Sequence, residues 1–288
     1  MKKIFKLGIF PDEISQDFER ALYVTAKEFG LKYVDLRTLW NKNLIDLTEM
    51  DLKRAKRMIE KQGLLVRCIA SPFLKSRLRE SSTVQGDTFL VEEKSYDENL
   101  DILRHCIELA KMFSTKLVRC FSFWKEGEFN EEILEEIISK FKKPLEIVKK
   151  EGIILALENE HTCNVGTGAQ ARKLLKEIDS PNLKLIWDPG NALFAGEIPY
   201  PDGYEKIKDE IIYVHIKDAA PNKKTGKMEW KLVGAGEIDF KGQLQSLLNN
   251  RFEGVVSLEN EYVPSTGDKE QGTRESFHEL KKILVSLT

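Results

Sequence analysis

Eight short apolar runs, each followed by a helical pattern, constrain the fold of this chain more than any other feature. The runs are rich in Val, Ile and Leu and show little polar alternation, which is typical of strands buried on both faces of a parallel sheet. They cover residues 5–10, 33–36, 64–70, 116–121, 153–157, 183–187, 211–216 and 255–258.

The segments between these runs are typical of amphipathic helices. Residues 17–30 carry one apolar face and close at Gly30, a residue type common at helix C-caps. Residues 47–63 begin with the capping-box pattern Thr48-x-x-Asp51, which satisfies backbone donors at a helix start. Helical patterns of the same kind follow the later runs.

This regular alternation predicts an α/β fold. Eight strand–helix units of about 30 residues or more predict a closed (β/α)8 TIM barrel, with residues 1–288 forming a single domain. A doubly wound open sheet is the alternative. Such a sheet usually carries a Gly-rich phosphate loop after its first strand, where this chain reads FPDEIS.

Composition and charge limit the partners and the cellular location to be expected for this chain. Of 288 residues, 41% are hydrophobic and 32% are charged, with a formal net charge of −2, so nothing favours nucleic acid or an anionic membrane as a partner. The first apolar stretch is interrupted by Lys6 and no cleavage site follows, and no run approaches the about 20 apolar residues of a membrane span. The four cysteines form no C-x-x-C pair and are expected to be reduced core thiols. We expect a cytoplasmic, soluble protein, and leave a homo-oligomer open.

The tetrapeptide LENE ends both the fifth and the eighth apolar run. In a TIM barrel the C-terminal ends of all strands meet on one face, where active sites are built. The fifth run reaches Glu158, the sixth reaches Asp188, the seventh carries His215 and the eighth reaches Glu259. Four consecutive strands therefore offer three carboxylates and an imidazole to one shared pocket.

Convergence of these groups favours a metal ion. Two like charges 4 Å apart repel by about 4 kcal/mol at an effective dielectric of 20, so three close carboxylates require protons or a cation. Three carboxylate oxygens and an imidazole suit Mn²⁺, Mg²⁺ or Zn²⁺ and leave positions for water or substrate. One such acid taken alone is usually a solvated rim residue or a helix cap, but four matching strand ends favour a site.

Two long connections would lie on the same face. Residues 71–95 follow the third strand and residues 217–240 follow the seventh. Loops of this length in a compact domain are expected to be functional lids or disordered tips.

The strand ends read Glu, Asp-x-x-Asn, His-x-Lys-Asp and Glu in order. This succession resembles the xylose-isomerase-like barrels of the sugar-phosphate isomerase/epimerase superfamily, over essentially the whole chain, and residues 233–240 (VGAGEIDF) resemble the superfamily's Gly-x-Gly stretch. The resemblance implies that Glu158, Asp188, His215 and Glu259 bind a divalent metal, with Mn²⁺ first and Mg²⁺ or Zn²⁺ as alternatives. In the tagatose/psicose 3-epimerase branch two glutamates also act as acid and base, which implies this role for Glu158 and Glu259.

The implied function is a metal-dependent sugar or sugar-phosphate isomerase or epimerase of carbohydrate metabolism. Its substrate would be a small carbohydrate or polyol-derived ketone, and its reaction a proton transfer at the carbon next to a metal-polarised carbonyl. The expected substrate contacts are Asn191, Lys217, His161 and Trp124. Two alternatives stay open: a metal-dependent dehydratase of the dehydroshikimate type, and a catalytically silent sugar-binding barrel.

Some of these residues allow a second interpretation. Lys217 either holds a substrate oxygen or pairs with Asp218, and Trp124 either walls the pocket or packs loops. The GAG sequence at 234–236 lies where barrels commonly bind phosphate, but a turn explains it equally well.

Two departures from the superfamily matter. Asn191 stands where a His is frequent, and an amide can orient a hydroxyl group but cannot carry a proton at neutral pH. The endonuclease IV branch uses additional His ligands, whereas this chain has four His in all and its third and fourth strands are followed by Ser71 and Ser122. A three-metal nuclease is therefore not expected.

Overall fold

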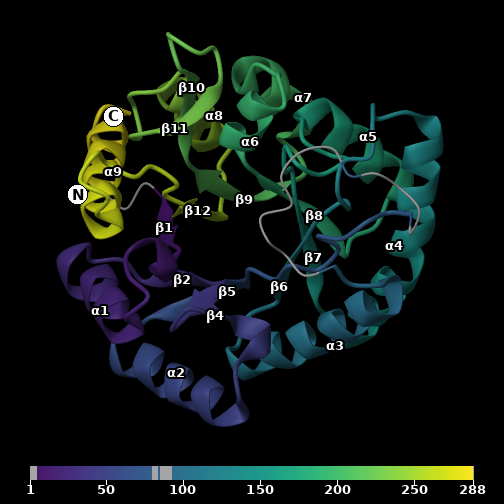
Figure 1. The fold of residues 1–288 in the computed structure, drawn as a ribbon, viewed down its shortest axis with the longest axis horizontal. Helices are drawn as coiled ribbons and strands as arrows, with labels where there is room; N and C mark the ends of the chain where they lie inside the picture. Colours follow the sequence, from purple (N-terminus) through teal and green to yellow (C-terminus); the bar gives the residue numbers. More distant parts are fainter. Residues whose placement is uncertain (1–4, 80–83, 85–92, 288) are drawn as a thin grey trace.

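The computed structural model describes residues 5–79, 84 and 93–287, and it shows parallel strands closed into a barrel inside a ring of helices (Figure 1). The strand order around the barrel is β1-β12-β9-β8-β7-β6-β5-β2. The barrel strands are β1 (Lys6–Ile9), β2 (Tyr33–Leu36), β5 (Leu65–Ile69), β6 (Leu117–Cys120), β7 (Ile154–Glu158), β8 (Leu183–Trp187), β9 (Ile211–Ile216) and β12 (Val255–Leu258). The predicted single TIM-barrel domain is confirmed.

The remaining elements cover the outside and the mouth of the barrel. The α-helices are α1 (Phe18–Tyr23), α2 (Glu49–Lys61), α3 (Tyr96–Met112), α4 (Glu131–Glu151), α5 (Gly168–Ile178), α6 (Pro189–Phe194), α7 (Tyr204–Ile207), α8 (Phe240–Asn249) and α9 (Lys269–Val285). Shorter helical turns are η1 (Pro11–Glu13), η2 (Val24–Glu28), η3 (Leu44–Asp46) and η4 (Pro199–Gly203), and two hairpins pair β3 (Thr38–Leu39) with β4 (Lys42–Asn43) and β10 (Asp218–Pro221) with β11 (Met228–Lys231).

Local sequence fixes where several helices begin. Thr48 accepts a hydrogen bond from the Asp51 backbone N–H at 3.2 Å, as the capping pattern predicted. Ser95 and Glu98 form a reciprocal capping box before α3, with bonds of 2.7 and 3.3 Å. Gly152 ends α4 with φ of 65°, a left-handed conformation that glycine adopts without steric cost.

The barrel interior is layered because side chains of a strand alternate between its two faces. A buried cluster inside the barrel contains Leu117, Ala156, Ile186, Tyr213 and Val255. Residues two positions further along the same strands therefore form the next layer toward the C-terminal face. That layer is polar and contains Glu158, Asp188 and His215, and Glu259 lies two residues beyond it along its own chain segment.

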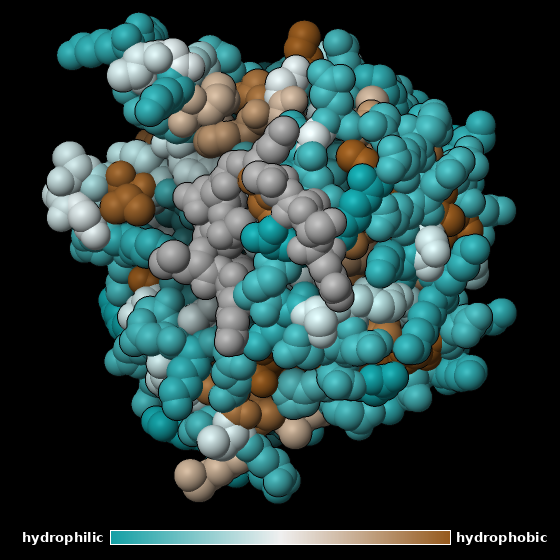
Figure 2. Space-filling view, turned by 45° about the vertical axis from the view of Figure 1, so that its right-hand side comes forward, coloured by the Kyte–Doolittle hydropathy of each residue, from teal (hydrophilic) through white to brown (hydrophobic). Residues whose placement is uncertain are grey.

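The chain contains no disulfide, since all four cysteines are free and buried. Cys68 lies in β5 and Cys120 in the neighbouring strand β6. Among the described residues, no helix is long and apolar enough to cross a membrane. On the face drawn in Figure 2, hydrophobic residues form small separate patches, which is normal for a protein surface.

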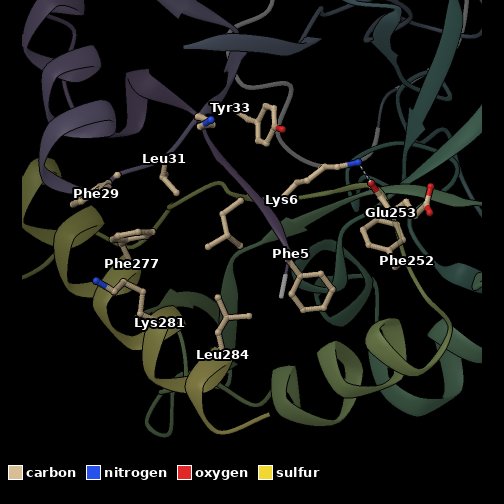
Figure 3. A pocket seen from close by; sticks show the side chains of 14 residues that line it. Phe5, Lys6, Phe29, Leu31, Tyr33, Phe252, Glu253, Phe277, Lys281 and Leu284 are labelled. Atoms are coloured by element: carbon tan, nitrogen blue, oxygen red, sulfur yellow. Dashed lines mark hydrogen bonds between the residues drawn. The ribbon is translucent and has the colours of Figure 1, made fainter. Parts of the chain in front are cut away.

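A cavity of about 730 Å³ opens at the opposite, N-terminal end of the barrel (Figure 3). Aromatic and aliphatic side chains from the starts of β1 and β2 and from α9 line it, among them Phe5, Leu31, Tyr33 and Phe277. None of the predicted site residues contributes to this cavity, so its size alone does not mark the functional site.

Candidate metal centre at the barrel mouth

The four predicted ligands come together at the C-terminal ends of consecutive strands. Glu158 ends β7, Asp188 follows β8 and caps α6, His215 lies in β9 and Glu259 follows β12. One ligand atom from each residue lies within 4.8 Å of the others, and all four side chains are buried.

The imidazole of His215 occupies the middle of this group. Its Nδ1 lies 3.2 Å from Glu158 Oε1, 3.2 Å from Glu259 Oε2 and 3.6 Å from Asp188 Oδ2. Although burial favours the neutral ring, the carboxylates of Glu158 and Glu259 hold the pKa of His215 well above its usual value. In the absence of a metal, a proton shared by these groups therefore partly balances the carboxylates, and a bound cation would replace it.

Asp188 provides the test of whether a metal fits. Its Oδ1 accepts the Asn191 backbone N–H at 2.8 Å, whereas its buried Oδ2 accepts no hydrogen bond within the described part of the chain. Lys217 Nζ lies 3.0 Å from that oxygen but outside hydrogen-bonding geometry. A buried carboxylate oxygen without a hydrogen bond, beside two further carboxylates and an imidazole, suits a divalent cation.

Lys217 brings a positive charge to the same three carboxylates. Its Nζ lies 3.0 Å from Asp188 Oδ2, 3.1 Å from Glu259 Oε2 and 3.9 Å from Glu158 Oε1. Although burial favours the neutral amine, Asp188 and Glu259 hold the pKa of Lys217 well above its usual value. Lys217 is therefore a charged ammonium group in this arrangement, and its ion pairs are with these three carboxylates, whereas the sequence had left open a pairing with Asp218 or a contact with a substrate oxygen.

Two arginines hold the outer oxygens of the glutamates. Arg119, from β6, places Nη1 2.9 Å from Glu158 Oε2, and Arg37 places Nη1 2.9 Å from Glu259 Oε1. Although burial raises the pKa of both glutamates, His215 and Arg119 bring that of Glu158 below its usual value, and Lys217 and His215 bring that of Glu259 well below it. Each glutamate thus turns one ionised oxygen inward and keeps the other paired.

Sequence reasoning missed both arginines. Arg119 lies inside an apolar run and Arg37 directly follows another, so a charge within or next to a buried strand was the signal available. Arg37 also binds Asp12 at 2.7 Å and contacts Glu13, which connects η1 to the centre.

The two LENE copies use their Asn residues differently. Asn159 accepts the Asp188 backbone N–H at 2.8 Å and donates to the Asp188 carbonyl at 2.8 Å, so it fixes the position of a candidate ligand. Asn260 accepts a bond from Ser276 at 2.6 Å and donates to the Tyr262 carbonyl at 2.8 Å, so it ties the last loop to α9.

Asn191 links the centre to His161. Its Nδ2 donates to Glu158 Oε1 at 3.3 Å, and its Oδ1 accepts from His161 Nδ1 at 3.0 Å. The His161 ring lies 4.7 Å from the Phe194 ring and 6.1 Å from the Trp230 ring, measured between centroids. Asn191 is fully buried, whereas His161 is partly exposed at the mouth.

The aromatic wall of the mouth differs from the expected one. Trp124 is only 1% exposed and belongs to a buried cluster with Phe121 and Cys163, so its position favours loop packing. Trp230, on β11, lies 5.1 Å from Lys217 Nζ and also faces His161. An aromatic residue within the long connection at 217–240 was the signal for it.

The two long connections can now be placed. The segment 217–240 folds partly into the β10–β11 hairpin beside the site. Its GAG turn is held by Asp218, whose Oδ2 accepts the N–H groups of Gly234 at 2.8 Å and Gly236 at 3.0 Å. Within the other connection, 71–95, which was expected to be a lid or a disordered tip, residues 80–83 and 85–92 lie outside the described residues.

Two curated proteins match parts of this chain in sequence. A fragment of 137 residues is 32% identical to an uncharacterized protein of Methanocaldococcus jannaschii, covering 46% of this chain and 45% of that protein. A fragment of 150 residues is 27% identical to the inosose dehydratase of Clostridium botulinum, covering 48% of this chain and 50% of that enzyme. The matches thus span about half the length of these curated relatives.

Solved structures match over nearly the whole chain. A D-tagatose 3-epimerase-like protein superposes with a TM-score of 0.71 at 20% identity, covering 98% of each chain. A Mycobacterium smegmatis xylose isomerase-like TIM barrel, solved in complex with magnesium, gives a TM-score of 0.68 at 18% identity, covering 93% of this chain and 89% of that one. Identities this low establish the fold alone.

The family assignment comes from a match of a different kind. The model for the xylose isomerase-like TIM barrel family matches residues 24–283, nearly the whole barrel. The chain belongs to the xylose isomerase-like TIM barrel family.

Proposed function

We propose that this chain is a divalent-metal-dependent isomerase or epimerase of a small sugar or polyol-derived ketone. The observation that carries the proposal is the inward convergence of Glu158, Asp188, His215 and Glu259, with Asp188 Oδ2 lacking a hydrogen bond. Mn²⁺ is the ion we expect first. The mixed set of carboxylates and an imidazole also suits Mg²⁺ and Zn²⁺. When bound, the ion supplies Lewis acidity that polarises a substrate carbonyl.

The remaining groups then have distinct tasks. The inward oxygens, Glu158 Oε1 and Glu259 Oε2, are the positions that take and return the proton of the carbon next to the carbonyl. Arg119 and Arg37 keep those oxygens aimed inward by holding the opposite oxygen of each carboxylate. Lys217 binds a substrate oxygen through its ammonium group.

The geometry supports an unphosphorylated substrate. Barrels commonly bind phosphate at backbone N–H groups of a Gly-rich turn after strands seven and eight. Here the N–H groups of Gly234 and Gly236 already donate to the Asp218 carboxylate. The ring of Trp230 beside Lys217 supplies instead an apolar face on which a sugar or cyclitol ring can pack.

A dehydratase is the second candidate function, because curated relatives that match about half of the chain are named inosose dehydratases. Dehydration of a β-hydroxy ketone begins with the same loss of a proton next to the carbonyl. A third possibility, a silent sugar-binding barrel, would bind metal and sugar without proton exchange.

One experiment separates the three. The purified protein is incubated in D₂O with D-fructose, D-tagatose, 2-keto-myo-inositol or 3-dehydroshikimate, each with Mn²⁺, Mg²⁺ or Zn²⁺, and products are followed by NMR. We expect metal-dependent deuterium incorporation next to the carbonyl of at least one compound. Epimer or isomer formation supports the first function, and loss of water supports the second. Sugar binding without exchange or turnover would contradict both enzymatic functions.

A further inference from the structure

The β10–β11 hairpin lies next to the metal centre, with Lys217 directly before its first strand and Trp230 in its second. We propose that Asp218 and Trp230 are positioning residues of this centre: Asp218 closes the base of the hairpin, and Trp230 holds the ammonium group of Lys217 at the ligand carboxylates. The hairpin thereby sets the affinity of the centre for its ion. The inference rests on the divalent-metal site of the proposed function and assigns a role to residues outside the ligand set.

Asp218 is a buried carboxylate that is bound by backbone N–H groups on both of its oxygens. Its Oδ2 accepts the N–H groups of Gly234 and Gly236 at 2.8 and 3.0 Å. Its Oδ1 accepts those of Ala219 and Ile238 at 2.8 and 3.4 Å. A cradle of N–H groups of this kind is a typical anion site. Here the anion is a side chain of the chain itself, so the carboxylate holds the start of β10 and the turn after β11 together.

The turn at Gly236 fits closely around this carboxylate. A Cβ at position 236 would collide with Asp218 Oδ1 and with the Ala219 carbonyl oxygen. The Glu237 N–H donates to the same Ala219 carbonyl at 2.8 Å. The GAG sequence therefore closes the base of the hairpin around Asp218.

Trp230 connects this closed base to Lys217. It pairs across the hairpin with Ala219, the residue next to Asp218. Its ring lies 4.1 Å from the Phe194 ring between centroids, and the Lys217 Nζ lies 5.1 Å from the centroid of the Trp230 ring. A cation within about 6 Å of an aromatic centroid is attracted to the face of the ring. Trp230 therefore adds to the contacts that keep the ammonium group in place.

Gly190 allows Lys217 and Trp230 to pack against the same helix as a ligand. It lies in the first turn of α6, which Asp188 caps. A Cβ at Gly190 would lie 2.8 Å from the Cγ and the carbonyl oxygen of Lys217 and 3.1 Å from Trp230 Cζ3. Lys217 and Trp230 are therefore positioned together, directly beside Asp188.

The ammonium group of Lys217 and a metal ion compete for the same carboxylates. Its Nζ lies 3.0 Å from Asp188 Oδ2 and 3.1 Å from Glu259 Oε2, and both residues are candidate ligands. An ion that binds these oxygens must displace the ammonium group, so each contact that holds Lys217 in place weakens metal binding. Loss of a cation–π contact corresponds to about 2–30-fold in an equilibrium constant. Removing or loosening Trp230 should therefore tighten metal binding, whereas general damage to the centre would weaken it.

The test measures Mn²⁺ affinity by titration in Trp230→Leu and Asp218→Asn, each made in the wild type and in Lys217→Met. Asn at 218 keeps the size of Asp but turns an NH₂ group toward N–H donors, which loosens the base of the hairpin. Asp17→Asn is the matched control, because Asp17 accepts the Arg20 N–H at 3.1 Å but caps α1. Melting temperatures are measured first, so that folded proteins are compared.

We expect Trp230→Leu and Asp218→Asn each to tighten Mn²⁺ binding by about 2–30-fold in the wild type. In Lys217→Met the same changes should alter it by less than about 2-fold, because the residue through which they act is gone. Asp17→Asn should match the wild type.

Weaker or unchanged Mn²⁺ binding in both variants, or an equal change with and without Lys217, would overturn the inference and leave the metal site standing. A change in one variant alone would overturn the role given to the other residue. If the wild type binds none of Mn²⁺, Mg²⁺ and Zn²⁺, the proposed function itself is contradicted.

A second readout follows Trp230 directly and needs neither metal nor substrate. Of the four Trp residues, Trp124 and Trp187 are buried, and Trp230→Phe identifies the contribution of Trp230 to the fluorescence. We expect Asp218→Asn to increase the quenching of Trp fluorescence by acrylamide, and to leave it unchanged when Trp230→Phe is also present. Equal quenching in the wild type and Asp218→Asn would contradict the link between Asp218 and Trp230.

Discussion

Arg119 Nη1 lies 2.9 Å from Glu158 Oε2, the carboxylate oxygen that does not contact His215. Both side chains are buried, and they come from the neighbouring strands β6 and β7. Arg37 makes the equivalent contact with the outer oxygen of Glu259. The two glutamates are thus oriented by protein contacts before any metal arrives.

This arrangement predicts the behaviour of Arg119→Met. Breaking a buried ion pair by removing one partner costs about 3–5 kcal/mol of unfolding free energy, because the other charge stays buried. The metal-free variant should be destabilised by this order, and Mn²⁺ should raise its melting temperature more than that of the wild type, since the ion neutralises Glu158. Denaturant unfolding with and without Mn²⁺ measures both effects.

Arg104→Met is the matched control for that experiment, because Arg104 forms an exposed pair with Asp101 on α3. It should change the unfolding free energy by no more than about 0.5 kcal/mol. Equal, small effects of the two arginine substitutions would contradict the buried pairing.

Metal binding should depend on Asp188. Asp188→Asn keeps an oxygen that can cap α6 but removes the charge at the oxygen that lacks a hydrogen bond. Removing a residue that hydrogen-bonds to a metal ligand costs about 10–100-fold in metal affinity. Removing the charge of a ligand itself should therefore cost at least as much. Titration and elemental analysis measure this, with the exposed Asp101→Asn as control. Wild-type affinity in Asp188→Asn would exclude the site.

Lys217 should oppose metal binding. Its ammonium group and the ion are attracted by the same carboxylate oxygens, so Lys217→Met should tighten Mn²⁺ binding by at least about 10-fold, which corresponds to about 1.4 kcal/mol. The metal-free variant should melt at a lower temperature, because three carboxylates lose a counter-charge. Unchanged or weaker Mn²⁺ binding in a folded Lys217→Met protein would show that the ammonium group does not compete.

The buried Asp35 predicts a pH dependence of stability. Burial raises its pKa from 3.8 to about 6, although hydrogen bonds from Ser257 and Tyr213 partly offset the rise. The folded state therefore binds the proton at a higher pH than the unfolded chain, so this group destabilises the fold above pH 6 and the penalty disappears as pH falls toward 4. A rise of this size corresponds to about 3 kcal/mol.

Asp35→Asn isolates the contribution of this group, because the variant cannot ionise and keeps an oxygen that accepts hydrogen bonds. Relative to wild type, Asp35→Asn should gain stability between pH 4 and pH 7 by about 3 kcal/mol. Urea unfolding across this range, with the same metal content in both proteins, gives the comparison. A difference that does not change with pH would contradict the raised pKa.

The sequence predicted the barrel well because buried parallel strands have a local signature. The runs at 33–36, 183–187, 211–216 and 255–258 begin and end at the predicted residues, and the others differ by one residue at each end. The candidate ligands could also be predicted from the sequence, because a barrel brings the C-terminal ends of all its strands to one face.

The rest of the site depended on contacts that no local pattern encodes. Arg119 and Lys217 become counter-charges only when the pleat turns them toward the same carboxylates. His161 comes next to Asn191 only through the packing of the loop after β7 against α6. Trp230 reaches the mouth because residues 218–231 form a hairpin, where the sequence predicted a lid or a disordered tip without a pairing of strands.

The glutamate pair gives the last prediction. If Glu158 and Glu259 take and return the proton, Glu158→Gln and Glu259→Gln should each lower hydrogen exchange by about 10²–10⁴-fold or more. Asn191→Ala should act mainly through weaker substrate binding and misplacement of His161, because the amide transfers no proton. Metal occupancy must be measured in every variant, since each glutamate is also a candidate ligand. Full exchange by a metal-loaded Glu158→Gln, Glu259→Gln protein would exclude the pair as acid and base and leave it a role in metal binding alone.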